Sequence, residues 1–209
     1  MFLTEYEPPE RRRAFASGGV ELRLTEAAVM LAFALHLLEQ TEGTGTVYIH
    51  PDGEHAKIFD ISAFLLNLGF ERVEALGTTA YGGRYVREDA NIIVRPASGL
   101  GDVVGVVAGR RVVAECKGGV INSNHAGQKS RLRKGLSELV GQLMLLPLDG
   151  SRQVAVLPFT DEVLRIANRL MPRCAAAGLE IALVSAEGRV DFVRSAEDLR
   201  AAAPVTAIA

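Results

Sequence analysis

Three residues near the middle of the chain have the types and the spacing of a divalent-metal site. Asp102 opens a β-branched run, and Glu115 and Lys117 lie near the end of the next run. The Ala-Gly-Arg segment between the runs has the composition of a tight hairpin turn. Because side chains alternate along a strand, Glu115 and Lys117 point to the same face, which puts a carboxylate beside an ammonium group.

The position of the turn decides which residue faces Asp102. Antiparallel pairing about a turn at Gly109-Arg110 sets Asp102 opposite Lys117, whereas a turn one residue earlier sets it opposite Glu115. In either register the three side chains cluster.

The chemistry of such a cluster is phosphodiester hydrolysis. Two clustered carboxylates repel each other unless a cation lies between them, and oxygen ligands favour Mg²⁺ or Mn²⁺. A metal held by Asp102 and Glu115 can polarise a phosphate oxygen and activate a water molecule, which Lys117 would position. The alternative is an ordinary cross-strand salt bridge at a solvated strand end.

Hydrophobic periodicity and turn residues predict alternating helices and strands around the hairpin. We expect helices over residues 25–40, 54–68, 127–146 and 161–177, strands over 47–49, 70–76, 84–95 and 153–157, and a final pair of strands within 180–193. Residues 1–24 show no sustained period and are expected to be irregular. The fold class expected is α/β, with a mixed central sheet flanked by helices.

The chain shows no internal repeat and no low-complexity linker, so one α/β domain is the simplest organisation. We expect an N-terminal arm and helix over residues 1–45, the α/β core over 46–195, and a C-terminal helix and tail over 196–209.

The run GDVVGVVAGRRVVAECKGG, residues 101–119, resembles the signature of the PD-(D/E)xK nuclease superfamily, which includes restriction endonucleases, Holliday-junction resolvases and Mrr-like enzymes. By this resemblance Asp102 is the motif aspartate, Glu115 the second acid and Lys117 the motif lysine. The resemblance also implies that the backbone carbonyl of Cys116 is a further metal ligand. The implied fold is restriction-endonuclease-like, here with an N-terminal helical extension.

The order of the elements agrees with this resemblance, since a helix and a strand precede the hairpin and a helix and a strand follow it. These elements are residues 54–68, 84–95, 127–146 and 153–157. Many members place a glutamate on the first core helix, for which Glu54 is the candidate here, with Glu26 and Glu39 as alternatives. By the same resemblance, Gln128 or Gln142 would orient the lysine or the substrate, although an ordinary helix-flank glutamine is the commoner case.

Nucleic-acid binding would have to use local basic patches, because the net charge is −2 and the pI is about 6.1. Arg11, Arg12 and Arg13 form one such patch. The second patch, which we expect to bind DNA, consists of Lys129, Arg131, Arg133 and Lys134. Contacts from it to the phosphate backbone would be independent of base sequence. The ordinary alternative is solvated surface charge.

Other classes of protein are disfavoured. The chain lacks a GxxxxGK[ST] phosphate loop, a GxSxG elbow, an HExxH motif and paired CxxC motifs. Cys116 and Cys174 are too few for a disulfide framework or a Cys-rich zinc site. The most apolar stretch, residues 27–38, is too short to span a bilayer. We therefore expect a soluble cytoplasmic protein without a membrane partner.

The sequence thus predicts an endonuclease that depends on Mg²⁺ or Mn²⁺ and acts on DNA. The substrate form stays open between duplex, branched and single-stranded DNA, or RNA. A homodimer is compatible with the sequence, although the chain shows no heptad pattern that would indicate a coiled-coil dimer. The alternative is a catalytically silent nuclease-fold subunit that binds DNA or assembles with partners.

Overall fold

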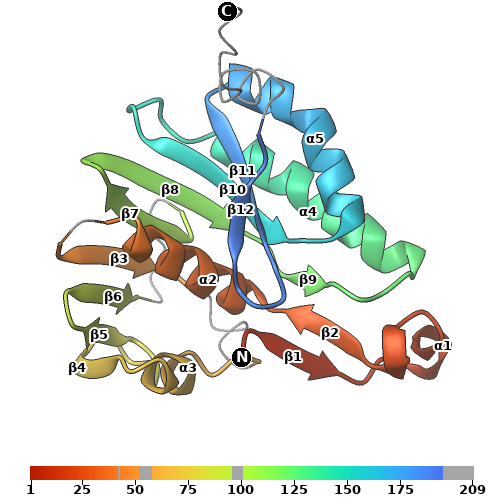
Figure 1. The fold of residues 1–209 in the computed structure, drawn as a ribbon, viewed down its shortest axis with the longest axis horizontal. Coiled ribbons are helices and arrows are strands. Elements are labelled where there is room, and N and C mark those ends of the chain that lie inside the picture. The colour runs from red at the N-terminus through yellow and green to blue at the C-terminus, as the bar shows by residue number, and fades with distance from the viewer. Residues whose placement is uncertain (42, 52–57, 96–100, 195–209) are drawn as a thin grey trace, which may run out of the picture.

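The structure, a computed structural model, describes residues 1–41, 43–51, 58–95 and 101–194. Within these residues one mixed sheet has the strand order β12-β11-β10-β8-β7-β3-β6-β5-β4, and a smaller sheet has the order β1-β2-β9 (Figure 1). The large sheet contains β3 (Gly45–Ile49), β4 (Glu71–Ala75), β5 (Gly83–Arg87), β6 (Ala90–Val94), β7 (Val103–Val107), β8 (Arg110–Cys116), β10 (Arg152–Pro158), β11 (Leu179–Val184) and β12 (Val190–Phe192). The small sheet contains β1 (Leu3–Tyr6), β2 (Glu21–Leu24) and β9 (Gly119–Val120). The helices are α1 (Glu10–Arg13), the 3-10 helix η1 (Ser17–Gly19), α2 (Glu26–Glu39), α3 (Ile61–Asn67), α4 (Ala126–Leu143) and α5 (Asp161–Ala176).

The predicted hairpin is present as β7 and β8 and lies in the middle of the large sheet. Its turn consists of Ala108 and Gly109, whose φ angles of 49° and 76° have the positive sign that a type I′ turn requires. The resulting ladder pairs Val103 with Ala114. Continued by one residue, this register sets Asp102 opposite Glu115, which is the second of the two predicted alternatives.

Two helical layers cover opposite faces of the sheet, as predicted for a mixed sheet flanked by helices (Figure 1). Cys116 and Val156 pack in the core cluster that contains α2, whereas Ala155 and Leu157 pack in the cluster that contains α4 and α5. Strands β8, β10 and β11 are parallel, as expected for the late strand-helix-strand unit. Among the described helices, none combines the length and apolar character needed to cross a membrane.

Two elements differ from the predicted ones in the middle of the chain. Residues 84–95 are not one long strand, because the chain turns at Glu88 and Asp89 and forms the antiparallel pair β5 and β6. The helix expected over 54–68 begins only at Ile61, with the Asp60 side chain accepting from the N–H of Ala63. Residues 54–57 of that prediction lie outside the described residues.

The N-terminal region is more ordered than predicted. Residues 1–24 are not irregular, since β1 pairs with β2, and β2 pairs with β9, which lies about a hundred residues further along the chain. The helix that we expected in an N-terminal extension is α2, and it packs in the larger core cluster. The predicted C-terminal helix over residues 196–209 lies outside the described residues.

Both edges of the large sheet carry charged strands. All five residues of β4 are exposed, among them Glu71, Arg72 and Glu74, and the pairing with β5 shifts register around Val73. At the other edge, β12 has only three residues and its Asp191 pairs with Arg189 at 2.9 Å.

A close backbone contact joins the end of β8 to the start of α2. A Cβ atom added at Gly118 would lie 2.5 Å from the Glu26 nitrogen and 2.6 Å from the Leu24 oxygen. These neighbours are backbone atoms that cannot rotate away, so only glycine fits at this position. The contact fixes Lys117, the preceding residue, against the first turn of α2.

We predict that Gly118→Ala lowers the free energy of unfolding by about 1–3 kcal/mol, because the added methyl group overpacks a backbone contact. Gly141→Ala is the matched control. It lies on α4 with open space around it, so the same change should stabilise the protein by about 0.5–1 kcal/mol. Chemical denaturation measures both, and equal stabilities would contradict the close contact.

Candidate active site

Backbone hydrogen bonds hold Asp102 on both sides. Its N–H donates to the Ala114 oxygen at 2.8 Å, and its carbonyl accepts from the N–H of His50 at 2.8 Å. Its side-chain Oδ2 accepts from the N–H of Cys116 at 2.8 Å. The carboxyl group is thereby tied across the hairpin to the strand that carries Glu115 and Lys117.

The Asp102 and Glu115 side chains form one carboxyl pair. Burial raises the pKa of Asp102 to about 7; the Cys116 N–H opposes this shift, and the Glu115 and Glu26 carboxylates add to it. Burial also raises the pKa of Glu115, against a hydrogen bond from Asp102. Without a cation the pair therefore tends to hold a proton near neutral pH. A bound divalent cation would replace that proton.

Lys117 lies between two further carboxylates. Its Nζ is 3.7 Å from Glu26 Oε2 and 3.4 Å from Glu138 Oε1. Partial burial lowers the pKa of Lys117, but Glu26 and Glu138 outweigh it, so the pKa lies above its usual value. Lys117 is therefore an ammonium ion at neutral pH. It can donate hydrogen bonds and stabilise negative charge, but it cannot take a proton from water.

Glu26 is the helix glutamate that the structure brings to this cluster. Thr25 caps α2 by accepting from the N–H of Ala28 at 3.1 Å, which places Glu26 in the first turn, beside Lys117. Glu39 lies at the other end of α2. Glu54, our first candidate, lies outside the described residues.

Sequence reasoning missed Glu138, although a signal for it existed. Gly135 lies seven residues from each of the candidate glutamines Gln128 and Gln142, and a Cβ atom added there would lie 3.7 Å from the Lys117 Cβ. Glu138 follows three residues later, on the same side of the helix. It acts on Lys117 and not on the carboxyl pair.

The donor set consists of oxygen atoms. A residue's N–H and C=O point to the same edge of a strand, and the Cys116 N–H points to Asp102, so the Cys116 carbonyl also points to that edge. Among the described residues, no group of three or more His, Cys, Asp or Glu side chains is arranged to hold a metal ion. Two carboxylates and a carbonyl still fit Mg²⁺, which keeps several waters and is commonly held by one or two carboxylates.

The cluster lies where the helical layer over the sheet ends. Glu115 and Lys117 continue the face of β8 that α4 covers, and Lys117 contacts Glu138 of that helix. On the same face of the neighbouring strands, Tyr48 is 37% and Val106 is 54% exposed. Within the described residues, this face of the sheet is therefore partly exposed on the neighbouring strands.

The two candidate glutamines have other positions. Gln128 is buried, and its Nε2 donates to the buried Glu21 carboxylate at 3.3 Å, so it supports Glu21 and not Lys117. Gln142 is exposed one turn beyond Glu138.

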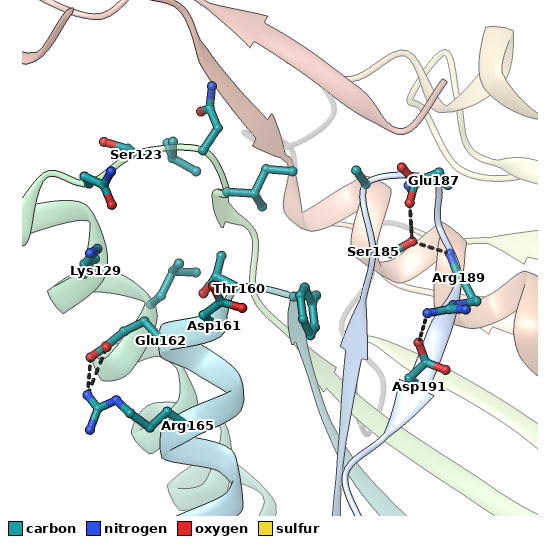
Figure 2. A pocket seen from close by; sticks show the side chains of 17 residues that line it. Ser123, Lys129, Thr160, Asp161, Glu162, Arg165, Ser185, Glu187, Arg189 and Asp191 are labelled. Carbon is teal, nitrogen blue, oxygen red and sulfur yellow. Dashed lines mark hydrogen bonds and ion pairs between the residues drawn. The ribbon is translucent and has the colours of Figure 1, made fainter. Parts of the chain in front are cut away.

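The four basic residues of the predicted DNA-binding patch lie around the first turns of α4 and do not share one surface. Arg131, Arg133 and Lys134 are exposed, whereas Lys129 is half-buried. Lys129 lines a cavity of about 760 Å³ at the ends of β10 and β11 (Figure 2). Arg131 instead lines two smaller cavities on the side of Glu26 and α1.

Comparisons with family models, with curated proteins and with solved structures found no match for this chain.

The pKa of Asp102 predicts how stability depends on pH in the absence of metal. A carboxyl whose pKa is raised on folding stabilises the protein fully below its unfolded pKa of 3.8, and this contribution is lost as the pH rises through about 7. Asp102→Asn keeps an acceptor for the Cys116 N–H without the charge. We expect this variant to gain stability over the wild type as the pH rises from about 4 to 8, by at most about 4 kcal/mol.

Denaturation in EDTA at several pH values measures this difference. Asp149→Asn is the control, because hydrogen bonds to Ser151 lower the pKa of the exposed Asp149 and its removal should give no such gain. A constant difference between wild type and Asp102→Asn across the range would contradict the raised pKa.

Proposed function

We propose that the protein is a metal-dependent endonuclease that hydrolyses phosphodiester bonds in DNA. The observation that carries this proposal is the Asp102–Glu115 carboxyl pair, held by the central hairpin next to the Lys117 ammonium ion. Because carboxylates repel phosphate, such a pair serves a phosphate substrate only when a cation lies between them.

The topology also supports a restriction-endonuclease-like core. The superfamily order of helix, three antiparallel strands, helix and parallel strand corresponds to α2, β3, β7, β8, α4 and β10, with β3, β7, β8 and β10 adjacent in the sheet. On this proposal the first core helix and strand are α2 and β3, whereas the assignment from sequence used residues 54–68 and 84–95. The elements α3 and β4 to β6 would then form an insertion between β3 and β7.

The residues of the site have different roles in the proposed reaction. Asp102 and Glu115, with the Cys116 carbonyl, would hold Mg²⁺ or Mn²⁺, which supplies a Lewis acid for the phosphate and a more acidic water. Lys117 donates from its ammonium group to the attacking water or to the phosphate oxygens. Glu26 and Glu138 keep Lys117 charged and fix the position of its ammonium group.

We predict that the purified protein cuts or nicks DNA with Mg²⁺ or Mn²⁺, and that Asp102→Ala and Lys117→Ala each reduce the rate about a hundredfold or more. Asp149→Ala, on the exposed segment before β10, is the control and should retain full activity. A gel-based screen over duplex, branched and single-stranded DNA and RNA measures cleavage and identifies the substrate form. Undiminished cleavage in both variants would overturn the site assignment.

The metal also predicts a result that is independent of cleavage. At about pH 8, where the carboxyl pair has lost its proton, Mg²⁺ or Mn²⁺ should raise the melting temperature of the wild type, because it binds only the folded protein. Asp102→Asn should lose most of this shift, and Asp149→Asn should keep it. If DNA binds but no metal stabilises the protein and no cleavage occurs, the chain is a silent DNA-binding subunit.

A further inference from the structure

The cavity of about 760 Å³ at the ends of β10 and β11 is a poor site for phosphate, because its charged groups compensate one another. Glu162 pairs with Arg165 at 2.9 Å, and Arg189 pairs with Asp191 at 2.9 Å, as Figure 2 shows. The remaining lining charges are Lys129, Asp161 and Glu187. Acidic groups therefore outnumber basic ones around this cavity.

A smaller cavity at the N-terminal segment has the opposite character. It has a volume of about 300 Å³ and is lined by Arg11, Arg12, His125, Gly127, Gln128 and Arg131. No acidic residue is among the described residues that line it. The two basic patches of the sequence, more than a hundred residues apart, thus meet across one cleft between α1 and the start of α4.

This cleft leads toward the candidate active site. Gln128 and Arg131 also line a neighbouring cavity of about 220 Å³, whose wall includes Arg23, Glu26 and Gly118. Glu26 contacts Lys117, and Gly118 directly follows it. The neighbouring cavity, with Arg23 and Arg131 in its wall, therefore reaches from the cleft at α1 to the residues around Lys117.

A buried hydrogen-bond network fixes the walls of the cleft. The Glu21 carboxylate is fully buried, accepts from Gln128 Nε2 at 3.3 Å, and lies 3.4 Å from Arg12 Nη2. These contacts tie α1, β2 and α4 together. Because the buried Glu21 carboxylate contacts one side of the Arg12 guanidinium, that side chain is held in place at the wall of the cavity, where it keeps 15% of its exposure.

Two arginine donors in this cleft and the neighbouring cavity lack acceptors among the described residues. Arg12 Nε and Arg23 Nε are buried and have no hydrogen-bond partner within the described part of the chain. The same described residues provide no ion pair for Arg11 or Arg131, whereas Arg13 pairs with Glu7. Buried donors are normally satisfied, so these groups indicate a ligand rich in oxygen acceptors.

His125 adds a further donor to the cleft. Its Nδ1 accepts from the N–H of Gly127 at 3.2 Å, so the neutral ring carries its proton on Nε2. Phosphate offers several charged oxygens that arginine binds in a bidentate manner, and it matches a pocket of arginines and one imidazole N–H.

We propose that this cleft binds phosphate groups of the nucleic-acid strand that flank the bond to be cut. The proposal rests on the proposed nuclease function for the identity of the strand. It assigns four arginines to strand binding, namely Arg11, Arg12, Arg23 and Arg131. Of the four residues of α4 that the sequence predicted to bind DNA, only Arg131 is in this set. Binding through these groups is independent of base sequence and sensitive to salt.

The test measures binding of fluorescent oligonucleotides by anisotropy in EDTA, where no cleavage occurs, over a range of salt concentrations. The variant is Arg11→Ala combined with Arg131→Ala, since both side chains lack ion pairs within the described residues and the fold should tolerate their loss. Exposed Arg169→Ala on α5 is the control for a change in charge. We expect the slope of log K against log salt to fall by about 0.7–0.9 for each arginine that contacts phosphate, and the control to match the wild type. Restoring the charges as Arg11→Lys with Arg131→Lys should recover most of the slope.

Three oligonucleotides distinguish the source of the phosphate: a circle, a linear strand with a 5′ phosphate, and the same strand with a 5′ hydroxyl. Equal effects of the variant on all three indicate internal phosphodiesters, and an effect confined to the 5′ phosphate indicates a terminal group. A slope in the double variant equal to that of the control overturns the cleft, even if cleavage is intact. If the double variant shows the expected fall in slope but the wild type cleaves no nucleic acid with any metal, the proposed nuclease function is wrong, whereas phosphate binding in the cleft is supported.

Discussion

The register of the β7–β8 hairpin is the constraint on which the site depends. A two-residue turn at Ala108 and Gly109 fixes which residues pair across the hairpin, and a slip of one residue would set Asp102 opposite a different side chain. The turn itself is held by the positive φ angles of its two residues. From this pairing follow the carboxyl pair, the hydrogen bond from Cys116 to Asp102 and the position of Lys117 next to α2.

Elements with strong local signals could be predicted from the sequence, and elements formed by distant partners could not. The helix opened by Thr25 and the helix around Leu136 have regular apolar spacing and clear ends, and both are present. Strand β2 has no such signal, because it forms by pairing with β1 and with the two-residue strand β9 far along the chain. The turn at Glu88 was missed because a glutamate there has a positive φ without a glycine to mark it.

The site could be predicted in part for the same reason. Asp102, Glu115 and Lys117 lie within one hairpin, where alternation of side chains determines their placement. Glu26 and Glu138 come from helices whose approach to Lys117 is set by tertiary packing, and only a close contact such as that at Gly118 specifies it. The sequence did not predict that the two basic patches lie on one cleft. The contact between them depends on the buried Glu21, which no sequence motif distinguishes.

The charged edges of the large sheet limit how copies of the protein can associate. An unprotected edge strand offers free backbone groups to a second sheet and invites aggregation. Here β4 presents Glu71, Arg72 and Glu74 with an irregular register, and the short β12 carries the Arg189–Asp191 ion pair. Extension of the sheet from one molecule into the next is therefore opposed at both ends. Association of two copies would therefore have to use a surface other than these two edges.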